Sequence, residues 1–309
     1  MSGRANLFQC AMAARQRAEP LVATASQVPA WLLIEVAGAW GHDAIAESEL
    51  GPFAPKVWRE AMRRRGVRVI AIRRDLTTST RHAHHRARLV HVVASRPGAA
   101  RAVAHRRVID LHDLVASTEP LATGHGVGAG WEPDFDRYVL VCTNGRHDSC
   151  CATFGRPLVR ALRTSRWAPQ VWECSHIGGD RFAANIVLLP DGFYFGGVDP
   201  AGAERLLAAH DGGRLDLACF RGRSTLRWPE QAAEHEVRSR LGLEALDAIT
   251  AVRTLDAGRI EVDLTDSRSV LVGVERTDRP VPTPLTCKGK SGLSSPEWRV
   301  TSFEELPAS

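Results

Sequence analysis

The chain has 309 residues, of which 44% are hydrophobic and 24% are charged, a composition typical of a folded globular protein. These values exclude a fibrous or globally disordered chain, and at this length the core needs no disulfide scaffold. The formal net charge of +5 is unevenly distributed, because 15 basic and 2 acidic residues lie between Lys56 and Arg107. This arginine-rich segment (56–107) predicts a basic surface that attracts an acidic partner, with a solvated basic face as the alternative.

Hydropathy and cysteine usage predict a cytoplasmic protein. The longest apolar runs fall far short of the roughly 18 residues that a membrane span needs. The first residues carry no long apolar core and so no secretory signal. In a reducing compartment the seven cysteines are not expected to form disulfides. Four of them fall between Cys142 and Cys174, with His147 and His176 nearby, a pattern that indicates a metal or redox site.

The first third of the chain is predicted to form an α/β unit. Its hydrophobic patterns predict strands over 31–36, 67–72, 89–94 and 108–109, a helix over 54–65, and a short helix from about residue 111. Glycine then alternates with other residues between Thr123 and Gly130. No strand runs directly into this stretch and no helix follows it, so a linker is favoured over a dinucleotide-binding loop.

The next segment has the order β-α-β-β-β-α. Strands are predicted over 137–142, 170–174, 185–189 and 193–195, with helices over 150–163 and 201–210. Asp199 and Pro200 fit the N-cap and first position of the second helix. This order is that of a thioredoxin-like mixed sheet with helices on its faces. The first third repeats it, which predicts two related halves.

After Cys219 the pattern changes again. A helix is predicted over 228–241, and strands over 249–255, 259–264 and 269–274, with 298–300 as a fourth strand. The predicted fold class is therefore α/β (α+β), with a thioredoxin-like domain, a related half before it, and a C-terminal helix with a small antiparallel sheet. The predicted units are an N-terminal half (1–122), a glycine-rich linker (123–134), the thioredoxin-like domain (135–218) and the C-terminal part (219–309).

The clustered cysteines fall at the ends of predicted strands. Cys142 closes one strand, Cys151 lies at the start of the following helix, and Cys174 and His176 end the next strand. In a thioredoxin-like sheet these two strand ends are neighbours, so the side chains should converge. Iron–sulfur clusters need about four thiolate or imidazole ligands. The amide groups at a helix N-terminus would also stabilise their negative charge.

Two motifs carry a resemblance to a known family. The segment 142–152 (CTNGRHDSCCA) and the segment 174–185 (CSHIGGDRFAAN) resemble the sucrase/ferredoxin-like family, whose second half is a thioredoxin-like ferredoxin. Shorter blocks near Glu19, Trp31, Trp40, Arg221 and Gln231 also resemble that family. The resemblance implies a [2Fe–2S] electron-transfer protein. Nothing in the sequence indicates glycosidase activity.

The resemblance also implies a ligand set. Eukaryotic relatives bind the cluster through a Cys-x8-Cys pair and a later His-x-Gly-Gly-His motif, which match Cys142, Cys151 and His176. Asp180 stands where those relatives have the second histidine. We expect Cys174 as the fourth ligand, because such clusters are usually held by sulfur or nitrogen, with Asp180 as the alternative.

The other candidate residues are interpreted mainly as structural. Cys150 is expected to be a small buried hydrophobic residue, and His147 to hydrogen-bond within its turn. Isolated Cys10, Cys219 and Cys287 are expected to be core or surface thiols. For Arg221 and Arg223 we consider the docking of an anionic substrate or partner, and structural ion pairing, as alternatives.

Three functions follow from the sequence. The leading one, which the resemblance implies, is an electron carrier or reductase that passes an electron on, with ferric siderophores as an acceptor class known from some relatives. Its expected donor is an acidic ferredoxin or flavoprotein reductase that docks on the basic segment. The second is a cluster-free thiol oxidoreductase using Cys142 with Cys150 or Cys151, which lack the usual Cys-x-x-Cys spacing. The third is a structural zinc site in an interaction protein. Nucleic-acid binding is disfavoured, because the arginine-rich segment has few interleaved aromatic residues.

Overall fold

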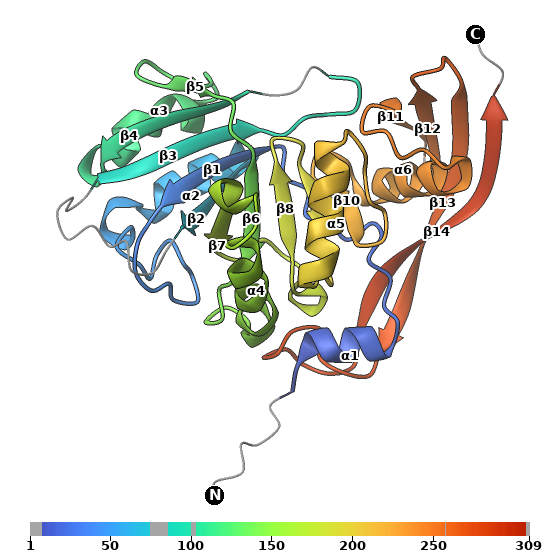
Figure 1. The fold of residues 1–309 in the computed structure, drawn as a ribbon, viewed down its shortest axis with the longest axis horizontal. Helices are drawn as coiled ribbons and strands as arrows, with labels where there is room; N and C mark the ends of the chain where they lie inside the picture. Colours follow the sequence, from blue (N-terminus) through green and yellow to red (C-terminus); the bar gives the residue numbers. More distant parts are fainter. Residues whose placement is uncertain (1–7, 75–85, 100–102, 257, 307–309) are drawn as a thin grey trace, which may run out of the picture.

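Strands from both predicted halves form one continuous sheet. The computed structural model describes residues 8–74, 86–99, 103–256 and 258–306, so parts of the arginine-rich segment lie outside the described residues. Within these ranges ten strands pair in the order β10-β9-β8-β6-β7-β2-β1-β3-β4-β5, and four more form a second sheet (Figure 1). None of the helices in these ranges is long and apolar enough to cross a membrane.

The first half contains two helices and five strands. They are β1 (Ala30–Glu35), α2 (Lys56–Arg64), β2 (Val67–Arg73), β3 (Arg86–Val93), β4 (Ala104–Asp110), α3 (Leu114–Thr123) and β5 (Glu132–Asp134). Strand β1 pairs in parallel with β2 and antiparallel with β3, and β3 pairs antiparallel with β4. The segment predicted as a linker includes β5, which adds to β4 as an edge strand.

The second half repeats this pairing. Its elements are β6 (Tyr138–Cys142), α4 (Ser149–Leu162), β7 (Val171–Cys174), β8 (Ile186–Leu189), β9 (Phe193–Phe195), α5 (Pro200–Asp211) and β10 (Phe220–Arg223). Strand β6 is parallel to β7 and antiparallel to β8, which pairs antiparallel with β9. The predicted thioredoxin-like arrangement is confirmed, and both halves have the same strand order. The domain boundaries stay predictions.

The two halves meet edge to edge through β2 and β7. These strands pair antiparallel, with Ile72 opposite Cys174 and Arg73 opposite Glu173. The carboxylate of Glu173 is buried, lies 3.1 Å from an Nη atom of Arg73, and accepts a hydrogen bond of 2.8 Å from Thr143. This contact places the loop after β6 beside the first half of the chain.

Helices cover one face of the large sheet. Helices α2 and α3 pack on the first half around Leu32 and Ile34, and α4 and α5 pack on the second half around Val139 and Val141. The opposite face forms one buried cluster that runs across both halves and contains Cys142, Cys151 and Cys174. The cysteines therefore lie in the core of the molecule rather than on a surface loop.

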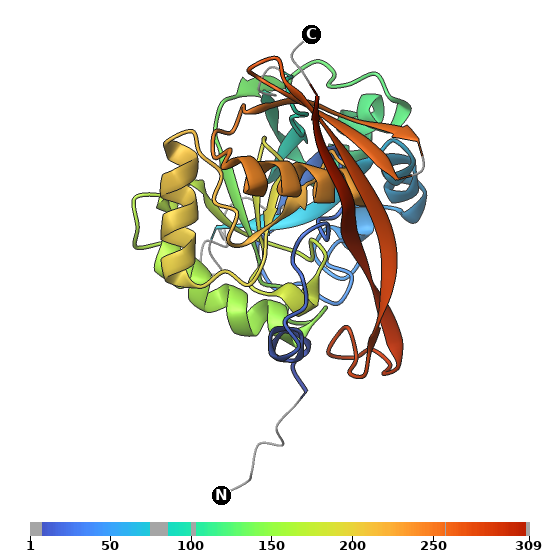
Figure 2. The same cartoon turned by 90° about the vertical axis from the view of Figure 1, so that its right-hand side faces the viewer.

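The C-terminal part forms the second sheet. It consists of α6 (Trp228–Leu241), β11 (Ile249–Asp256), β12 (Arg259–Leu264), β13 (Ser269–Val281) and β14 (Leu293–Leu306). The helix matches its predicted bounds, but β13 and β14 are much longer than predicted. They form a hairpin that extends away from the sheet toward α1 (Cys10–Gln16), a helix that the sequence reading did not predict (Figures 1 and 2).

A buried ion network attaches this part to the large sheet. Glu234 on α6 lies 3.0 Å from Arg223 of β10 and 3.3 Å from Arg238 one helical turn further. Burial alone would raise the pKa of Glu234, but the two arginines outweigh it and hold this pKa below its ordinary value. The carboxylate is therefore ionised in the folded protein and neutralises part of the arginine charge.

We predict that Glu234→Gln lowers the free energy of unfolding at pH 7 by about 3–5 kcal/mol, because it leaves two buried arginines without their anion. Since the folded-state pKa is lowered, the wild-type contribution is present above the unfolded pKa and disappears as the pH falls through the folded one. Urea titrations should therefore show the two proteins converging at acid pH. Glu236→Gln, in a partly exposed pair with Arg240, is the control. If the difference in the free energy of unfolding between wild type and Glu234→Gln stayed constant with pH, this assignment would be contradicted.

Candidate metal centre

The first part of the site is the turn from β6 into α4. Cys142 is the last residue of β6, and Asp148 caps α4 by accepting a hydrogen bond of 2.9 Å from the backbone amide of Cys150. Gly155 lets the helix approach the strand closely, since a Cβ atom at this position would lie 2.1 Å from the carbonyl oxygen of Cys142. This close approach brings Cys151, on the first turn of α4, beside Cys142.

The second part is the loop between β7 and β8. Gly178 and Gly179 have φ angles of +98° and +82°, which side chains other than glycine rarely adopt. The guanidinium group of Arg221 contacts this loop. It donates to the carbonyl of Gly178 at 3.1 Å and to Oδ1 of Asn185 at 2.8 Å. Asn185 in turn donates to the carbonyl of Gly179 at 2.8 Å. The loop is thus fixed by buried polar contacts.

These two parts bring five potential ligands together. Cys142, Cys151 and His176 have ligand atoms within 4.8 Å of one another, and so do His147, His176 and Asp180. The thiol of Cys151 donates to Oδ1 of Asp180 at 3.3 Å. Nδ1 of His176 lies 2.9 Å from the same oxygen but is poorly aligned for a hydrogen bond to it. The donors form two overlapping groups of three around His176.

The electrostatics of the site favour a bound cation. A hydrogen bond from Cys151 is the main cause that lowers the pKa of Cys142 to about 5, against the opposing effect of burial. The same contact raises the pKa of Cys151 well above its ordinary value. Burial would lower the pKa of His176, but Asp180 and Cys142 raise it to about 9. A thiolate and a carboxylate thus surround one protonated imidazole ring, and a metal ion that binds here takes the place of its proton.

Cys174 occupies a different position from the other predicted ligands. It is fully buried and lies directly opposite Cys142 in the parallel pair of β6 and β7. Its thiol belongs to neither of the two donor groups among the described residues. Burial raises its pKa well above the ordinary value, so it is a neutral thiol in this structure. The structure therefore brings together Cys142, Cys151, His176 and Asp180, with Cys174 behind them in the core.

The rings of three histidines lie next to one another, from the potential ligand His176 to the pocket beside the site. The ring of His147 stacks on His176 with 3.7 Å between centroids, and the ring of His42 lies 4.6 Å beyond His147. A pocket of about 350 Å³ opens beside them and is also lined by Arg68 of the arginine-rich segment. Arg68 donates to the carbonyl of His176 at 2.9 Å. The imidazole end of the site is thus its accessible end, since Cys142 and Cys151 are both buried.

A second group of potential ligands was missed by sequence reasoning. Cys10, Asp148, Cys150 and Cys287 have ligand atoms within 4.8 Å of one another. These residues come from α1, from the start of α4 and from the connection between β13 and β14. The signal available in the sequence was the Cys150–Cys151 pair, because adjacent residues of a helix face different directions and cannot serve one site equally. All seven cysteines are free thiols in the structure.

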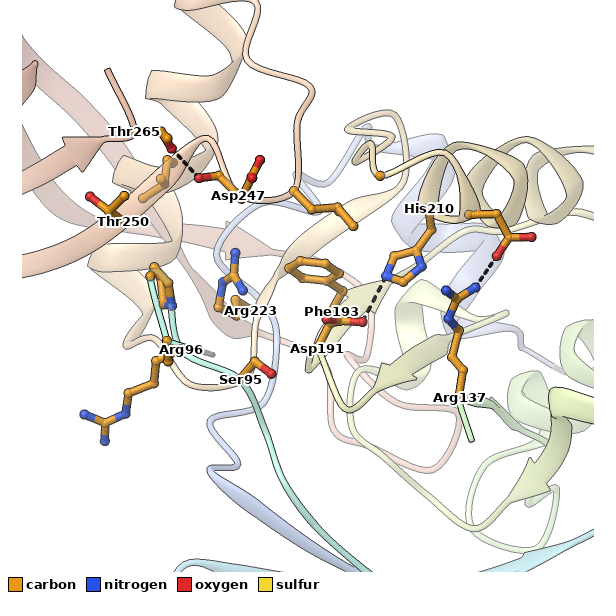
Figure 3. A pocket seen from close by; sticks show the side chains of 17 residues that line it. Ser95, Arg96, Arg137, Asp191, Phe193, His210, Arg223, Asp247, Thr250 and Thr265 are labelled. Atoms are coloured by element: carbon orange, nitrogen blue, oxygen red, sulfur yellow. Dashed lines mark hydrogen bonds and ion pairs between the residues drawn. The ribbon is translucent and has the colours of Figure 1, made fainter. Parts of the chain in front are cut away.

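The side chains of Arg221 and Arg223 are both buried, and the docking role considered for them stays a prediction. Arg221 is buried beneath the loop of the site, and Arg223 is buried in its ion pair with Glu234. Arg223 lines a separate pocket of about 550 Å³, together with Arg96 and His210 (Figure 3). This pocket shares no residue with either ligand group. Structural ion pairing and hydrogen bonding, the other reading of these arginines, fit what is observed.

Comparison with known protein families supports the geometry. The model of the sucrase/ferredoxin-like family matches residues 21–222, which include the whole large sheet except Arg223 and all five potential ligands of the first site. The chain belongs to the sucrase/ferredoxin-like family. Comparisons with curated proteins and with solved structures gave no significant match. Within this sucrase/ferredoxin-like protein, Cys10 and Cys287 lie outside the matched region.

The family assignment and the geometry agree on the character of the site. The family is named for ferredoxins, and this member carries two groups of Cys, His and Asp side chains that could hold a metal. The family of this sucrase/ferredoxin-like protein suggests a ferredoxin-like or thioredoxin-like role. Its first group combines thiol, imidazole and carboxylate donors at the ends of two neighbouring strands.

We predict that Arg221→Lys destabilises the protein and loosens the loop of the site. One ammonium group cannot replace the guanidinium contacts to Thr24, Gly178 and Asn185 together, so buried acceptors remain unpaired. The free energy of unfolding should fall by about 2–4 kcal/mol in urea titrations. Arg214→Lys, at a side chain that is 60% exposed, is the control. Equal stability of the two variants would show that Arg221 does not hold the loop.

Proposed function

We propose that this protein is an electron-transfer protein that binds one [2Fe–2S] cluster through Cys142, Cys151, His176 and Asp180. The observation that carries the proposal is the elongated arrangement of these donors. Cys142, Cys151 and His176 form one group, whereas Asp180 belongs with His176 to a second group that also contains His147. The four proposed ligands therefore do not form one compact group around a single ion. A binuclear cluster has two irons, each with its own pair of protein ligands.

The chemistry of the donors fits such a cluster. Two sulfur donors are available at the buried end, from Cys142 and Cys151, and an imidazole and a carboxylate at the accessible end, from His176 and Asp180. Sulfur and nitrogen are the usual ligands of these clusters, and a carboxylate would be the unusual member of the set. The poorly aligned Nδ1 of His176 is a buried nitrogen that lacks a well-formed partner, as expected of a ligand atom.

Asp180 is a better placed fourth ligand than Cys174. Oδ1 of Asp180 already contacts both Cys151 and His176, at 3.3 and 2.9 Å. Cys174 belongs to neither donor group, and it is neutral and fully buried behind Cys142. Cys174 would need a change in the strand end to reach the same position. We therefore propose Asp180 as the ligand and keep Cys174 as the competing assignment in the tests below.

When bound, a [2Fe–2S] cluster supplies a centre that accepts and releases one electron. The chain determines where that electron enters and leaves. The buried side chains of Cys142 and Cys151 keep water away from one end. The half-buried ring of His176 and the stacked ring of His147 form the path to the pocket at the other end. Electron exchange is therefore proposed to occur at this histidine end.

The partners that we propose follow from the positive charge beside the histidine end of the site. Arg68, from the arginine-rich segment, lines the pocket beside His176. An acidic ferredoxin or flavoprotein reductase would be attracted to a basic surface at this place, and so would an anionic ferric chelate such as a siderophore. We propose the first as electron donor and the second as acceptor class, in a cytoplasmic carrier or reductase.

One observation favours a second candidate function. The lowered pKa of Cys142 and the raised pKa of Cys151 make a thiolate–thiol pair, as in dithiol oxidoreductases. However, both sulfurs are buried, so a disulfide substrate has no access to them. A zinc ion on the same ligands is the third candidate. The visible spectrum separates the three, because only the iron–sulfur cluster is coloured.

The first experiment is a visible absorption spectrum of anaerobically purified protein, with iron and acid-labile sulfide measured on the same sample. The proposal predicts absorption that dithionite bleaches, with iron and sulfide near two per chain, as this cluster type requires. A colourless protein after anaerobic reconstitution would refute the electron-transfer proposal. It would leave the thiol and zinc functions for the first site.

The fourth ligand is tested by three variants. Asp180→Ala should bleach or shift the visible spectrum, whereas Cys174→Ser should leave it unchanged. Asp180→His should keep the colour and raise the reduction potential by on the order of 100 mV, because a neutral imidazole replaces an anionic carboxylate. Voltammetry measures the potential. Loss of the chromophore in Cys174→Ser, with Asp180→Ala unaffected, would assign the thiolate instead.

A further inference from the structure

The ligand group at the base of α4 differs in shape from the first site. Its four donors, Cys10, Asp148, Cys150 and Cys287, all lie within 4.8 Å of one another. The sulfur of Cys287 lies 3.4 Å from that of Cys150 and 3.6 Å from that of Cys10. The sulfur of Cys10 is 3.7 Å from both carboxylate oxygens of Asp148. The group is therefore compact, with every donor next to every other.

These distances match the edges of a single tetrahedral coordination sphere. With zinc–sulfur bonds of about 2.3 Å, two sulfurs on one zinc ion are about 3.8 Å apart. A polynuclear cluster distributes its ligands over several irons and so separates them further. Three thiolates with one carboxylate are also a donor set that suits zinc, which is tetrahedral and not redox-active.

The negative charge of Asp148 in this ligand group also favours the binding of a cation. Cys10, Cys150 and Asp148 are buried, and the described residues provide no basic side chain paired with Asp148. The carboxylate accepts hydrogen bonds from the backbone amides of Cys150 at 2.9 Å and Cys287 at 2.7 Å, and the thiol of Cys10 donates to it at 3.7 Å. Ala11, Ala183 and Phe154 pack around the thiols, and Arg15 lies over the ring of Phe154 and donates to the carbonyl of Ala183 at 2.8 Å. A buried carboxylate in apolar surroundings normally requires a counterion or a metal.

We propose that Cys10, Cys150, Cys287 and Asp148 form a second metal centre that binds one zinc ion. The site connects α1, the first turn of α4 and the tip of the β13–β14 hairpin, three segments that lie side by side in Figures 1 and 2. Its role is structural, because all four coordination positions are filled by protein atoms and none remains for a substrate. The site stands independently of the cluster proposed for the first site.

The test is the zinc content of the full-length protein, purified anaerobically without chelators and measured by mass spectrometry of the metals. The wild type should contain one zinc per chain. Cys287→Ser should reduce zinc to less than a tenth of that value, while iron and visible absorption remain those of the wild type. Cys287 is half-buried at the hairpin tip, outside the main core clusters, so this variant should fold. Cys219→Ser, a half-buried thiol in neither ligand group, is the control.

Two further measurements define the ligands. X-ray absorption at the zinc edge should show three sulfurs at about 2.3 Å and one oxygen at about 2.0 Å. Asp148→Asn keeps an oxygen for the helix cap but removes the charge, and should weaken zinc binding in chelator competition by about 10–100-fold. Hydrogen exchange at the hairpin tip should increase in Cys287→Ser.

Three results would overturn the proposal. The first is a wild type without zinc whose three thiols are counted as free or as a disulfide. The second is a Cys287→Ser variant that retains stoichiometric zinc. The third is the loss of iron rather than zinc in that variant, which would assign these ligands to a different metal. Because iron and visible absorption report separately on the first site, failure of either proposal can be recognised without the other.

Discussion

The antiparallel contact between β2 and β7 determines the architecture of this protein. Each strand is the outer partner of a parallel pair in its own half, so pairing them removes two exposed sheet edges at once. The buried Arg73–Glu173 pair lies at this contact, and Thr143 joins it from the loop after β6. Because Cys174 ends β7 and Cys142 ends its neighbour, the same contact places the ligand-bearing strand ends beside the loop that carries His42.

The first turn of α4 connects the two proposed centres. Cys151 faces the core and Asp180, whereas Cys150, its neighbour in sequence, faces α1 and the C-terminal hairpin. Asp148 caps this turn and also contributes to the second group. The position of one helix end therefore fixes donors for both groups, and Gly155 sets how closely that end approaches β6. Mutations in this turn affect two centres through one backbone segment.

Local patterns predicted much of this structure. Alternation and turn residues located the strands and helices of both halves, because each is specified by neighbouring residues such as Asp199 at the cap of α5. The pairing of β2 with β7 and the length of β13 and β14 were not predictable, since they depend on contacts between distant segments. For the site, motif spacing located Cys142, Cys151 and His176. The group around Cys287 was missed because Cys10 and Cys287 are isolated in the sequence and meet only through the fold.

The wide separation of the second group along the chain has a consequence for biosynthesis. The ligands of the first group are all present once residue 180 has been added, and the matched family region ends at residue 222. The second group spans from Cys10 to Cys287, so it is incomplete until Cys287 has been added. During synthesis, the proposed second centre cannot be complete before Cys287 has been added, whereas every donor of the proposed first centre comes earlier in the chain.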